Sequence, residues 1–259
     1  SMKSHLEAQV PALKSKIHVI HSWADPEQIK PLAKSDNPFA HRHDLVDPFT
    51  VLYSGNMGRC HDMDTILETA LLLRDQPSIQ FLFIGDGAQR QHCLKWVETH
   101  QLSNCRFLPY QAKATLPLSL AACDLALVSV KSGMERMIAP SKLYGHLATG
   151  KPIAVICSEE AYLSEMVLEG GFGRSFANHA AESLSQFIQA LQQDPQLAQQ
   201  MGARGRAYLE RWFTPNKIAE QYLRVFQHCL NPDLGKADLL RSGVVEEDST
   251  TPPRSKVNV

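Results

Sequence analysis

A hydroxyl group and an ammonium group follow one another at Ser141 and Lys142, directly after Pro140. Proline fits the first turn of a helix, where its missing N–H is no loss, and Gly150 can end that helix in a left-handed conformation. Ser141 and Lys142 would then lie beside backbone N–H groups that have no partner within the helix. This arrangement is suited to binding a phosphate. The alternative is that Ser141 only caps the helix and that Lys142 is a solvated surface charge.

Two apolar runs flank this segment, at residues 124–130 and 152–156. Both are short and bounded by polar residues, which is typical of strands that are buried on both faces in a parallel sheet. The loop before Pro140 is therefore expected at the carboxyl end of one strand and the amino end of the next helix. Open α/β sheets bind their ligands at that edge, so the sequence predicts an anion site there.

From residue 49 onward the chain alternates between strand and helix patterns. Strands are predicted at residues 49–53, 79–84, 106–108, 124–130, 152–156 and 173–177. Helices are predicted at residues 64–73, up to about residue 100, at 116–122 and 161–169, and as two or three helices within 180–230. Parallel neighbours need crossover connections, so this alternation predicts an α/β fold with a doubly wound parallel sheet of the Rossmann-like class.

The chain is expected to have three segments. These are a bridge and connector at residues 1–47, the Rossmann-like domain at 48–230, and a disordered tail at 231–259. The tail is assigned because its sequence loses apolar periodicity and cannot bury enough surface to order itself.

Two finer expectations concern the ends of the domain. Within the bridge, residues 17–20 are predicted to form a short strand, and residues 26–47, which are rich in Pro, Asp, Asn and His, an irregular connector. Near the other end, Gly202, Arg204 and Arg206 fall in a helical stretch and are expected to be solvated helix positions.

The composition is that of an ordinary globular protein. With 44% apolar residues, 20% charged residues and a net charge of -1, the chain has no strong field to attract nucleic acid or an anionic membrane. No apolar run approaches the roughly 18 residues of a membrane span, and the amino terminus does not resemble a signal peptide. The six scattered cysteines indicate reduced thiols, so a cytoplasmic location is expected.

A second candidate for anion binding is the loop G-N-M-G-R-C-H at residues 55–61, which follows the first predicted strand. Its glycines, Gly55 and Gly58, would let backbone amides approach a pyrophosphate. Arg59 adds a planar guanidinium group that is suited to phosphate. The alternative is that Arg59 is only a surface charge of the loop.

A metal site is not predicted. Asp62 and Asp64 spell the D-x-D pattern that some glycosyltransferases use to hold manganese. Carboxylates at the amino end of a helix are also favoured by capping and by the helix dipole, and this interpretation is preferred. His41 and His43 form a close pair, but neither cysteine nor carboxylate stands near them at ligand spacing.

The block from Glu135 to Pro152, with its segments P-S-K-L-Y-G and A-T-G-K-P, resembles the nucleotide-sugar-binding segment of GT-B glycosyltransferases. It is most similar to the retaining family 4, in its bacterial polysaccharide and O-antigen branch, and the resemblance covers about residues 17–228. It implies that the chain is the carboxy-terminal, donor-binding half of a GT-B enzyme. The amino-terminal, acceptor-binding domain would be absent from this chain, and any membrane association would be made through it.

The resemblance also implies roles for acidic side chains. Members of the family carry two glutamates eight positions apart, the first for the donor sugar and the second for the ribose. Counted back from Gly150, these positions are Met137 and Gly145 here. The nearest acidic residue is Glu135, which we therefore expect at the sugar hydroxyl groups.

The family binds the donor diphosphate with an arginine and a lysine in the loop after the first strand. In register, those positions are Asn56 and His61. Because neither is a fixed cation, Arg59 and Lys142 are predicted to bind the diphosphate instead. No cofactor or metal is implied, and the donor would be a UDP or GDP sugar.

Two more segments are assigned by the resemblance. Gly85 and Gly87 form a turn near the site, and Tyr110 and Gln111 follow the third strand, where family members hold the base. Alternatively, the first is only a turn and the second only a strand end. In all, the predicted catalytic residues are Arg59, Glu135 and Lys142, and the predicted binding residues are Gly55, Asn56, Gly58, His61, Gly85, Gly87, Tyr110, Gln111, Ser141 and Leu143.

The sequence thus predicts the donor-binding domain of a retaining glycosyltransferase that acts in polysaccharide or glycolipid biosynthesis. Two alternatives stay open. One is half of a nucleotide-sugar epimerase of the same architecture. The other is a nucleotide-sugar-binding module without catalytic activity, which the glycine at position 145 and the histidine at position 61 favour.

Overall fold

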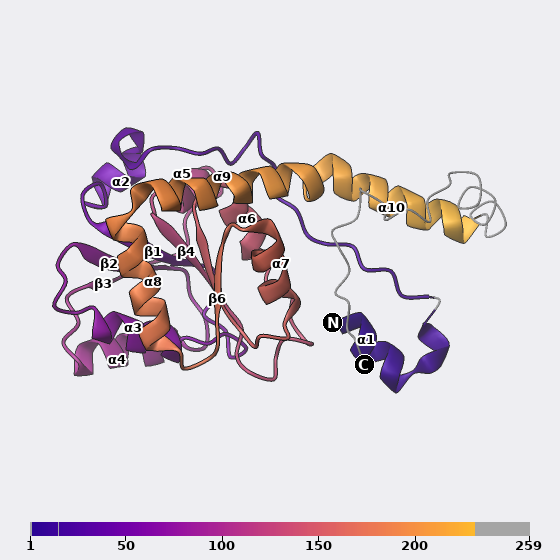
Figure 1. Ribbon diagram of the computed structural model, residues 1–259, viewed down its shortest axis with the longest axis horizontal. Helices are drawn as coiled ribbons and strands as arrows, with labels where there is room; N and C mark the ends of the chain where they lie inside the picture. Colours follow the sequence, from indigo (N-terminus) through magenta and orange to yellow (C-terminus); the bar gives the residue numbers. More distant parts are fainter. Residues whose placement is uncertain (1, 15, 231–259) are drawn as a thin grey trace.

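A parallel sheet of six strands forms the centre of the molecule (Figure 1), which is described by a computed structural model for residues 2–14 and 16–230. The strands are β1 Phe49–Ser54, β2 Ile79–Ile84, β3 Cys105–Leu108, β4 Leu125–Ser129, β5 Ile153–Ile156 and β6 Gly173–Phe176. Their order across the sheet is β3-β2-β1-β4-β5-β6, and all neighbours are parallel. The predicted doubly wound α/β fold is confirmed.

The helices are α1 Met2–Gln9, α2 Pro38–Arg42, α3 Asp64–Leu72, α4 Arg90–Thr99, α5 Leu116–Ala121, α6 Lys142–Ala148, α7 Tyr162–Gly170, α8 Ala181–Gln193, α9 Pro195–Trp212 and α10 Pro215–Leu230, with short 3-10 turns at Pro11–Leu13 and Lys34–Asp36. Helices cover both faces of the sheet, whereas α1 lies apart from it and α10 extends beyond it (Figure 1). Within the described part of the chain, none of these helices is both long and apolar enough to cross a membrane.

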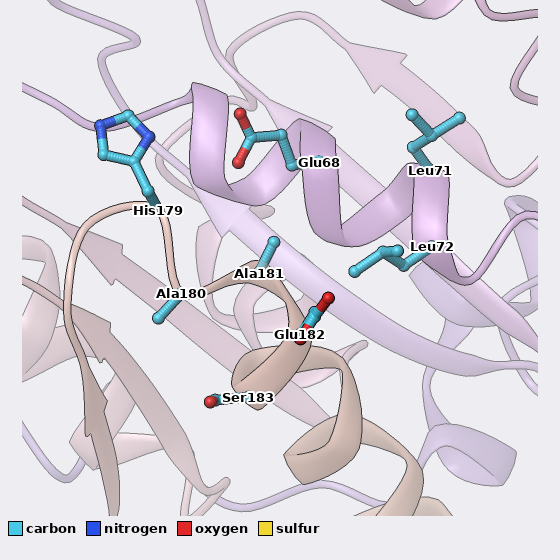
Figure 2. A pocket seen from close by; sticks show the side chains of 8 residues that line it. All are labelled: Glu68, Leu71, Leu72, His179, Ala180, Ala181, Glu182 and Ser183. Carbon is cyan, nitrogen blue, oxygen red and sulfur yellow. The ribbon is translucent and has the colours of Figure 1, made fainter.

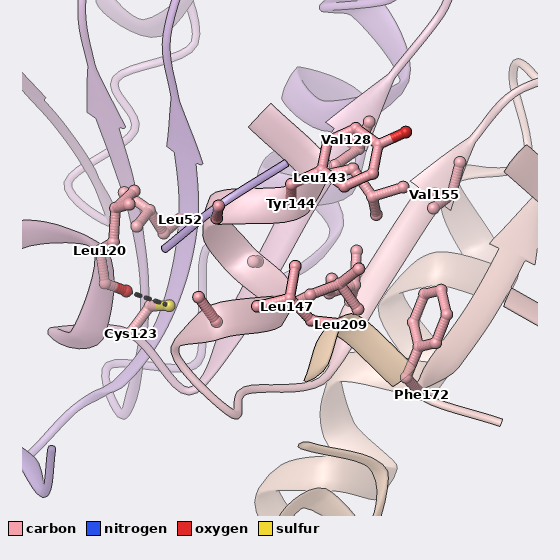
Figure 3. Packing of buried hydrophobic residues seen from close by; sticks show 14 of the residues in the cluster. Leu52, Leu120, Cys123, Val128, Leu143, Tyr144, Leu147, Val155, Phe172 and Leu209 are labelled. Atoms are coloured by element: carbon pink, nitrogen blue, oxygen red, sulfur yellow. Dashed lines mark hydrogen bonds between the residues drawn. The ribbon is translucent and has the colours of Figure 1, made fainter. Parts of the chain in front are cut away.

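Alternate residues of each central strand belong to two separate apolar cores, because successive side chains of a strand point to opposite faces. In β1, Leu52 packs with α5, α6, α7 and α9, whereas Val51 and Tyr53 pack with α3, α4 and α8. Figure 3 shows the first of these cores, in which Leu143 and Leu147 of α6 lie against the sheet. This packing fixes the position of α6 over β4.

The chain changes direction between β1 and β4, which are neighbours in the sheet. From β1 it continues to β2 on one side, and from β4 to β5 on the other. The connections diverge at this point, which is where doubly wound sheets bind their ligands, outside the carboxyl ends of β1 and β4. The loops at residues 55–63 and 130–141 border this position.

The connector differs from its prediction. Residues 17–20 form no strand, and residues 26–47 contain a 3-10 turn and helix α2. Asn37 caps α2 by accepting a hydrogen bond from the Phe39 N–H (3.0 Å), and Pro38 occupies the first turn. A helix of five residues is too short for an apolar period, so only its cap and proline signalled it in the sequence.

Two of the three helix positions expected to be solvated have structural contacts instead: Gly202 is buried and Arg206 is half-buried. Arg206 donates hydrogen bonds to the carbonyl oxygens of Pro26 (2.8 Å), Ile29 (2.6 Å) and Ala148 (2.7 Å), so it attaches the connector to the end of α6. Gly202 packs against the backbone of Gly150. Both contacts join segments far apart in sequence, which local patterns do not reveal. Arg204 is exposed, as predicted.

The bridge also contacts the domain through Tyr144. The Tyr144 hydroxyl is hydrogen-bonded to Nδ1 of His21 (2.9 Å), and both rings pack against Phe213. The tyrosine of the P-S-K-L-Y-G segment therefore holds the bridge. The tail predicted at residues 231–259 lies outside the described residues.

Candidate functional site

The loops after β1, β2 and β3 pack against one another at the carboxyl edge of the sheet. The Gly55 N–H donates to the Ile84 carbonyl (2.8 Å), and the Gly85 N–H donates to the Leu108 carbonyl (3.0 Å). Gly85 has a φ of +134°, and a Cβ atom there would lie 2.1 Å from the Gly55 carbonyl oxygen. Only glycine fits this position, so the predicted Gly85 turn positions the first loop.

The side chain of Asn56 lies between the first two loops. A Cβ atom on Gly87 would lie 2.4 Å from Asn56 Oδ1, and the backbone carbonyl of Asn56 accepts a hydrogen bond from the Tyr53 hydroxyl (2.8 Å). The structure therefore brings Gly55, Asn56 and the Gly85–Gly87 turn together as one rigid corner.

The side chain of Lys142 enters this corner from α6. Its Nζ lies 3.7 Å from the centre of the Tyr53 ring, and a Cβ atom on Gly55 would lie 3.3 Å from its Cε. The amine is buried and has no hydrogen-bond partner in the described part of the chain. Burial lowers the pKa of Lys142 to about 7. The alternative that Lys142 is a solvated surface charge is therefore wrong.

Helix α6 begins at Lys142, so the prediction that Pro140 lies in its first turn is wrong. Residues 134–138 form a turn of their own, in which the Met134 carbonyl accepts from the Ile138 N–H (3.2 Å), and this turn delays the helix. Ser141 is the residue before the helix, and its side chain makes no cap. Gly150 has the left-handed φ of +66° that its place after the helix predicted.

Two histidines lie near the Lys142 amine. His61 Nδ1 donates to the Ser129 carbonyl oxygen (2.8 Å), and burial, followed by the nearby Lys142, lowers the pKa of His61. His146, one turn along α6, is 0% exposed, and neither of its ring nitrogens has a partner in the described chain. Burial, followed by Lys142, lowers the pKa of His146 to about 3. The Ser129 hydroxyl is also buried without a partner there.

This cluster can bind an anion that brings its own acceptors. Within the described residues, Lys142 forms no ion pair, so no carboxylate of the chain satisfies it. Unsatisfied polar atoms are rare in protein interiors, and each calls for an explanation. Sequence patterns missed His146, Ser129 and Tyr53, although the four-residue spacing of Lys142 and His146 was a usable signal.

None of the remaining predicted residues is joined to the Lys142 amine by a hydrogen bond or ion pair in the described chain. Arg59 is exposed in the loop after β1. Glu135 accepts a hydrogen bond from the Ser158 N–H (3.3 Å), at the end of β5. Tyr110 is exposed, with its hydroxyl 3.5 Å from the Asp86 carbonyl.

The last three predicted residues have simple environments. Gln111 donates to the Pro109 carbonyl (2.8 Å), and Ser141 is exposed. The Leu143 side chain is 1% exposed within the apolar core, so only its backbone is left for a ligand contact.

The D-x-D aspartates have structural partners. Asp62 is buried and accepts hydrogen bonds from the Thr65 N–H (3.0 Å), the Thr65 hydroxyl (2.6 Å) and the Asn178 amide (2.5 Å). Asp64 pairs with His92 (2.8 Å). Asn178 also donates to the Val130 carbonyl (3.0 Å), so this network ties the loop after β6 to the end of β4. Sequence reasoning missed Asn178.

A cavity of about 440 Å³ lies elsewhere, between α3 and α8 (Figure 2). Glu68 and Glu182 line it together with Leu71, Leu72 and His179. Two carboxylates disfavour a diphosphate, and none of these residues belongs to the Lys142 corner. The cavity is therefore distinct from the candidate site.

The fold is a Rossmann-like, doubly wound domain, and the corner around Lys142 lies at the switch point of its sheet. The chain belongs to the family "Glycosyl transferases group 1", whose model matches residues 35–208. Family membership confirms the predicted glycosyltransferase resemblance and does not favour the epimerase or the non-catalytic module.

Named relatives agree with this family. The chain is 31% identical over 154 residues to "Probable glycosyltransferase WbjE" of Pseudomonas aeruginosa, covering 60% of this chain and 38% of the relative. It is 28% identical over 204 residues to "Putative colanic acid biosynthesis glycosyl transferase WcaI" of Escherichia coli (strain K12), covering 78% of this chain and 49% of the relative. The chain thus spans half or less of these relatives.

Two solved structures share the fold. Anabaena Alr3699/HepE, solved with UDP and glucose, matches with a TM-score of 0.69 at 17% identity, over 81% of this chain and 56% of that one. The carboxy-terminal domain of the group 1 glycosyl transferase LpcC from Francisella tularensis matches with a TM-score of 0.59 at 15% identity. That match covers 74% of this chain and 99% of that domain.

Proposed function

We propose that this chain is the donor-binding domain of a retaining glycosyltransferase, which transfers a sugar from a nucleotide-diphosphate sugar to an acceptor hydroxyl. The observation that carries the proposal is the Lys142 amine at the switch point of the sheet, which is buried and has no hydrogen-bond partner among the described residues. A diphosphate supplies the acceptor oxygens that this amine lacks. As the bond to the sugar breaks, negative charge grows on the leaving diphosphate, and a cation held beside it lowers the barrier.

We assign roles to the other predicted residues from the loops in which they lie. The amides of the Gly55–Arg59 loop contact the diphosphate, and the exposed Arg59 provides the second cation. Glu135, which is held at the end of β5, accepts hydrogen bonds from the sugar hydroxyls. Tyr110 and Gln111 follow β3 and contact the base. The HepE structure with UDP and glucose supports this choice of ligand, and WcaI supports a polysaccharide product.

A nucleotide sugar should therefore raise the melting temperature of the chain in the presence of EDTA. At a ligand concentration one hundred times Kd, the stabilisation is about 2.7 kcal/mol. The measurement is a thermal-shift screen of UDP and GDP sugars with EDTA, with magnesium or with manganese. A shift that requires manganese would contradict the proposal and favour a metal at Asp62 and Asp64. Asp64→Asn is the matched control, because it should leave the EDTA result unchanged.

The acceptor-binding domain is also part of the proposal, since the chain spans half or less of its curated relatives. Helix α10 extends beyond the sheet (Figure 1), and Ile218 is its only buried residue. Its side chains Tyr222, Leu223, Phe226 and Leu230 are exposed. They recur at the helical period and form one apolar face, which we call the α10 face.

Helix α10 contacts the bridge through His228, on the side of the helix opposite the α10 face. The rings of His18 and His228 are 6.0 Å apart, and Val19 and Trp23 of the bridge are also exposed. Exposed apolar side chains that gather on one side of a helix mark an interaction site. The bridge is the segment that would enter from the acceptor-binding domain, so we assign that domain as the occupant of the α10 face.

Charges on the α10 face should abolish this association. In Phe226→Glu with Leu230→Glu, the binding of a separately expressed amino-terminal domain should weaken at least a hundredfold, because each buried side chain contributes about 1.5–3 kcal/mol. Co-purification detects the complex of the two domains, and titration measures its Kd. The control is Leu168→Glu on α7, where Leu168 is 84% exposed, and it should bind as wild type.

Two outcomes would contradict this assignment. One is equal loss of binding in Leu168→Glu and the α10 variant. The other is that the chain alone forms a dimer, which light scattering would detect, and that the α10 substitutions make it monomeric. A second copy of the chain would then be the occupant of the α10 face. The isolated variants should melt as wild type does, because the replaced side chains are exposed.

A further inference from the structure

Among the described residues, the groups near the Lys142 amine carry no negative charge. From β1 it faces the Tyr53 ring at 3.7 Å, and from the loop after β1 it faces His61. From its own helix it faces His146. Burial raises the pKa of Tyr53 well above its usual range, so that hydroxyl is neutral as well. The described chain gives the amine no carboxylate partner.

The face of the Tyr53 ring attracts an ammonium group, but the loss of hydration opposes it, and the net effect of burial favours the uncharged amine. An ammonium group taken out of water without acceptors is costly, and desolvation lowers the pKa of a lysine for this reason. A diphosphate has the opposite effect, because negative charge within about 4–6 Å favours the ammonium form. The protonation of Lys142 therefore differs between the free chain and the complex with a diphosphate.

We propose that the nucleotide sugar binds with the uptake of one proton, which the Lys142 amine accepts. This inference rests on the proposed function and adds a regulation to it, since donor affinity then falls as the pH rises. The proton comes from solvent, and the product is an ammonium group paired with the diphosphate. No covalent bond of the donor changes in this step.

Proton linkage gives the direction and the size of the change in donor affinity with pH. The pKa of Lys142 is about 7 in the free chain, so above pH 7 the free amine is mostly neutral and must gain a proton on binding. Uptake should be about 0.9 proton per ligand at pH 8 and about 0.1 at pH 6, and affinity should be about fiftyfold weaker at pH 9 than at pH 7. His146 does not contribute, because its pKa of about 3 keeps the ring neutral throughout this range.

The test is calorimetric titration of the chain with UDP-glucose in two buffers of different ionisation enthalpy. The diphosphate of UDP-glucose is esterified at both ends, and the uracil base keeps its N3 proton at pH 8, so at that pH any proton exchanged belongs to the protein. Wild type should take up about 0.9 proton at pH 8. Binding at pH 8 without uptake would overturn the inference and leave the proposed function standing. If no UDP or GDP sugar binds at any pH, the proposed function itself fails.

His61 is the other group near the amine that could gain a proton. In His61→Gln, proton uptake at pH 8 should persist. If this variant binds UDP-glucose without taking up a proton, the proton belongs to His61 instead. A measurement that does not depend on binding is the NMR titration of lysine side-chain signals. One lysine should titrate near pH 7 in the free wild type and be missing in Lys142→Met. If every lysine titrates above pH 9, the inference is overturned.

Discussion

Replacing Lys142 with methionine should weaken the binding of UDP about ten- to hundredfold, because a charge-assisted hydrogen bond contributes roughly 1.5–3 kcal/mol. The melting temperature should stay the same or rise. Methionine has a similar length, and the substitution removes a buried amine that has no partner in the described chain. Calorimetry at pH 7 and thermal unfolding measure the two effects on the same sample.

Lys95→Met is the matched control for this substitution, since Lys95 is exposed on α4 and should not affect binding. Glu135→Ala gives a contrast, because a carboxylate is suited to sugar hydroxyls and not to phosphate. It should weaken a nucleotide sugar and spare UDP. Unchanged UDP affinity in Lys142→Met would refute the assignment of the site, as would an equal loss of both ligands in Glu135→Ala.

The second large effect is expected at Gly202, where alanine should lower the free energy of unfolding by about 3 kcal/mol. A Cβ atom there would lie 1.9 Å from the Gly150 carbonyl oxygen and 2.6 Å from its carbon. Gly150 has a φ of +66° and cannot move without releasing the end of α6. Helix α9 must therefore shift away from α6, although alanine favours the helix itself by about 1 kcal/mol.

Chemical denaturation of Gly202→Ala measures this loss. Gln200→Ala is the control on the same helix, since Gln200 is exposed and its substitution should change stability by less than about 0.5 kcal/mol. If the two variants had the same free energy of unfolding, the claim that Gly202 of α9 packs closely against the end of α6 would be wrong.

The sequence predicted the sheet well because each strand is a short apolar run between polar residues. All six strands lie where their runs predicted them, to within a residue or two at their ends. Helix α2 and the start of α6 were missed for a different reason. Their limits depend on local turns, such as the one at residues 134–138, and not on any apolar period.

The candidate site was predictable in part. The positions of Gly55, Gly85 and Lys142 at one edge follow from the order of strands and loops. The burial of the Lys142 amine does not follow, because it depends on Tyr53 and the loop at Gly55 packing against it in three dimensions. The hydrogen bonds from Arg206 to the connector were invisible for the same reason.

The attachment of the connector by Arg206 decides where the chain can be shortened. Phe39, Ala40 and Leu45 are buried in the same core as α6, and Asn37 donates to the Leu118 carbonyl (2.8 Å). A fragment that started at residue 48 would expose this part of the core to water. It would also deprive the Arg206 guanidinium of the Pro26 and Ile29 carbonyls. An expression boundary that preserves the fold therefore lies before Pro26.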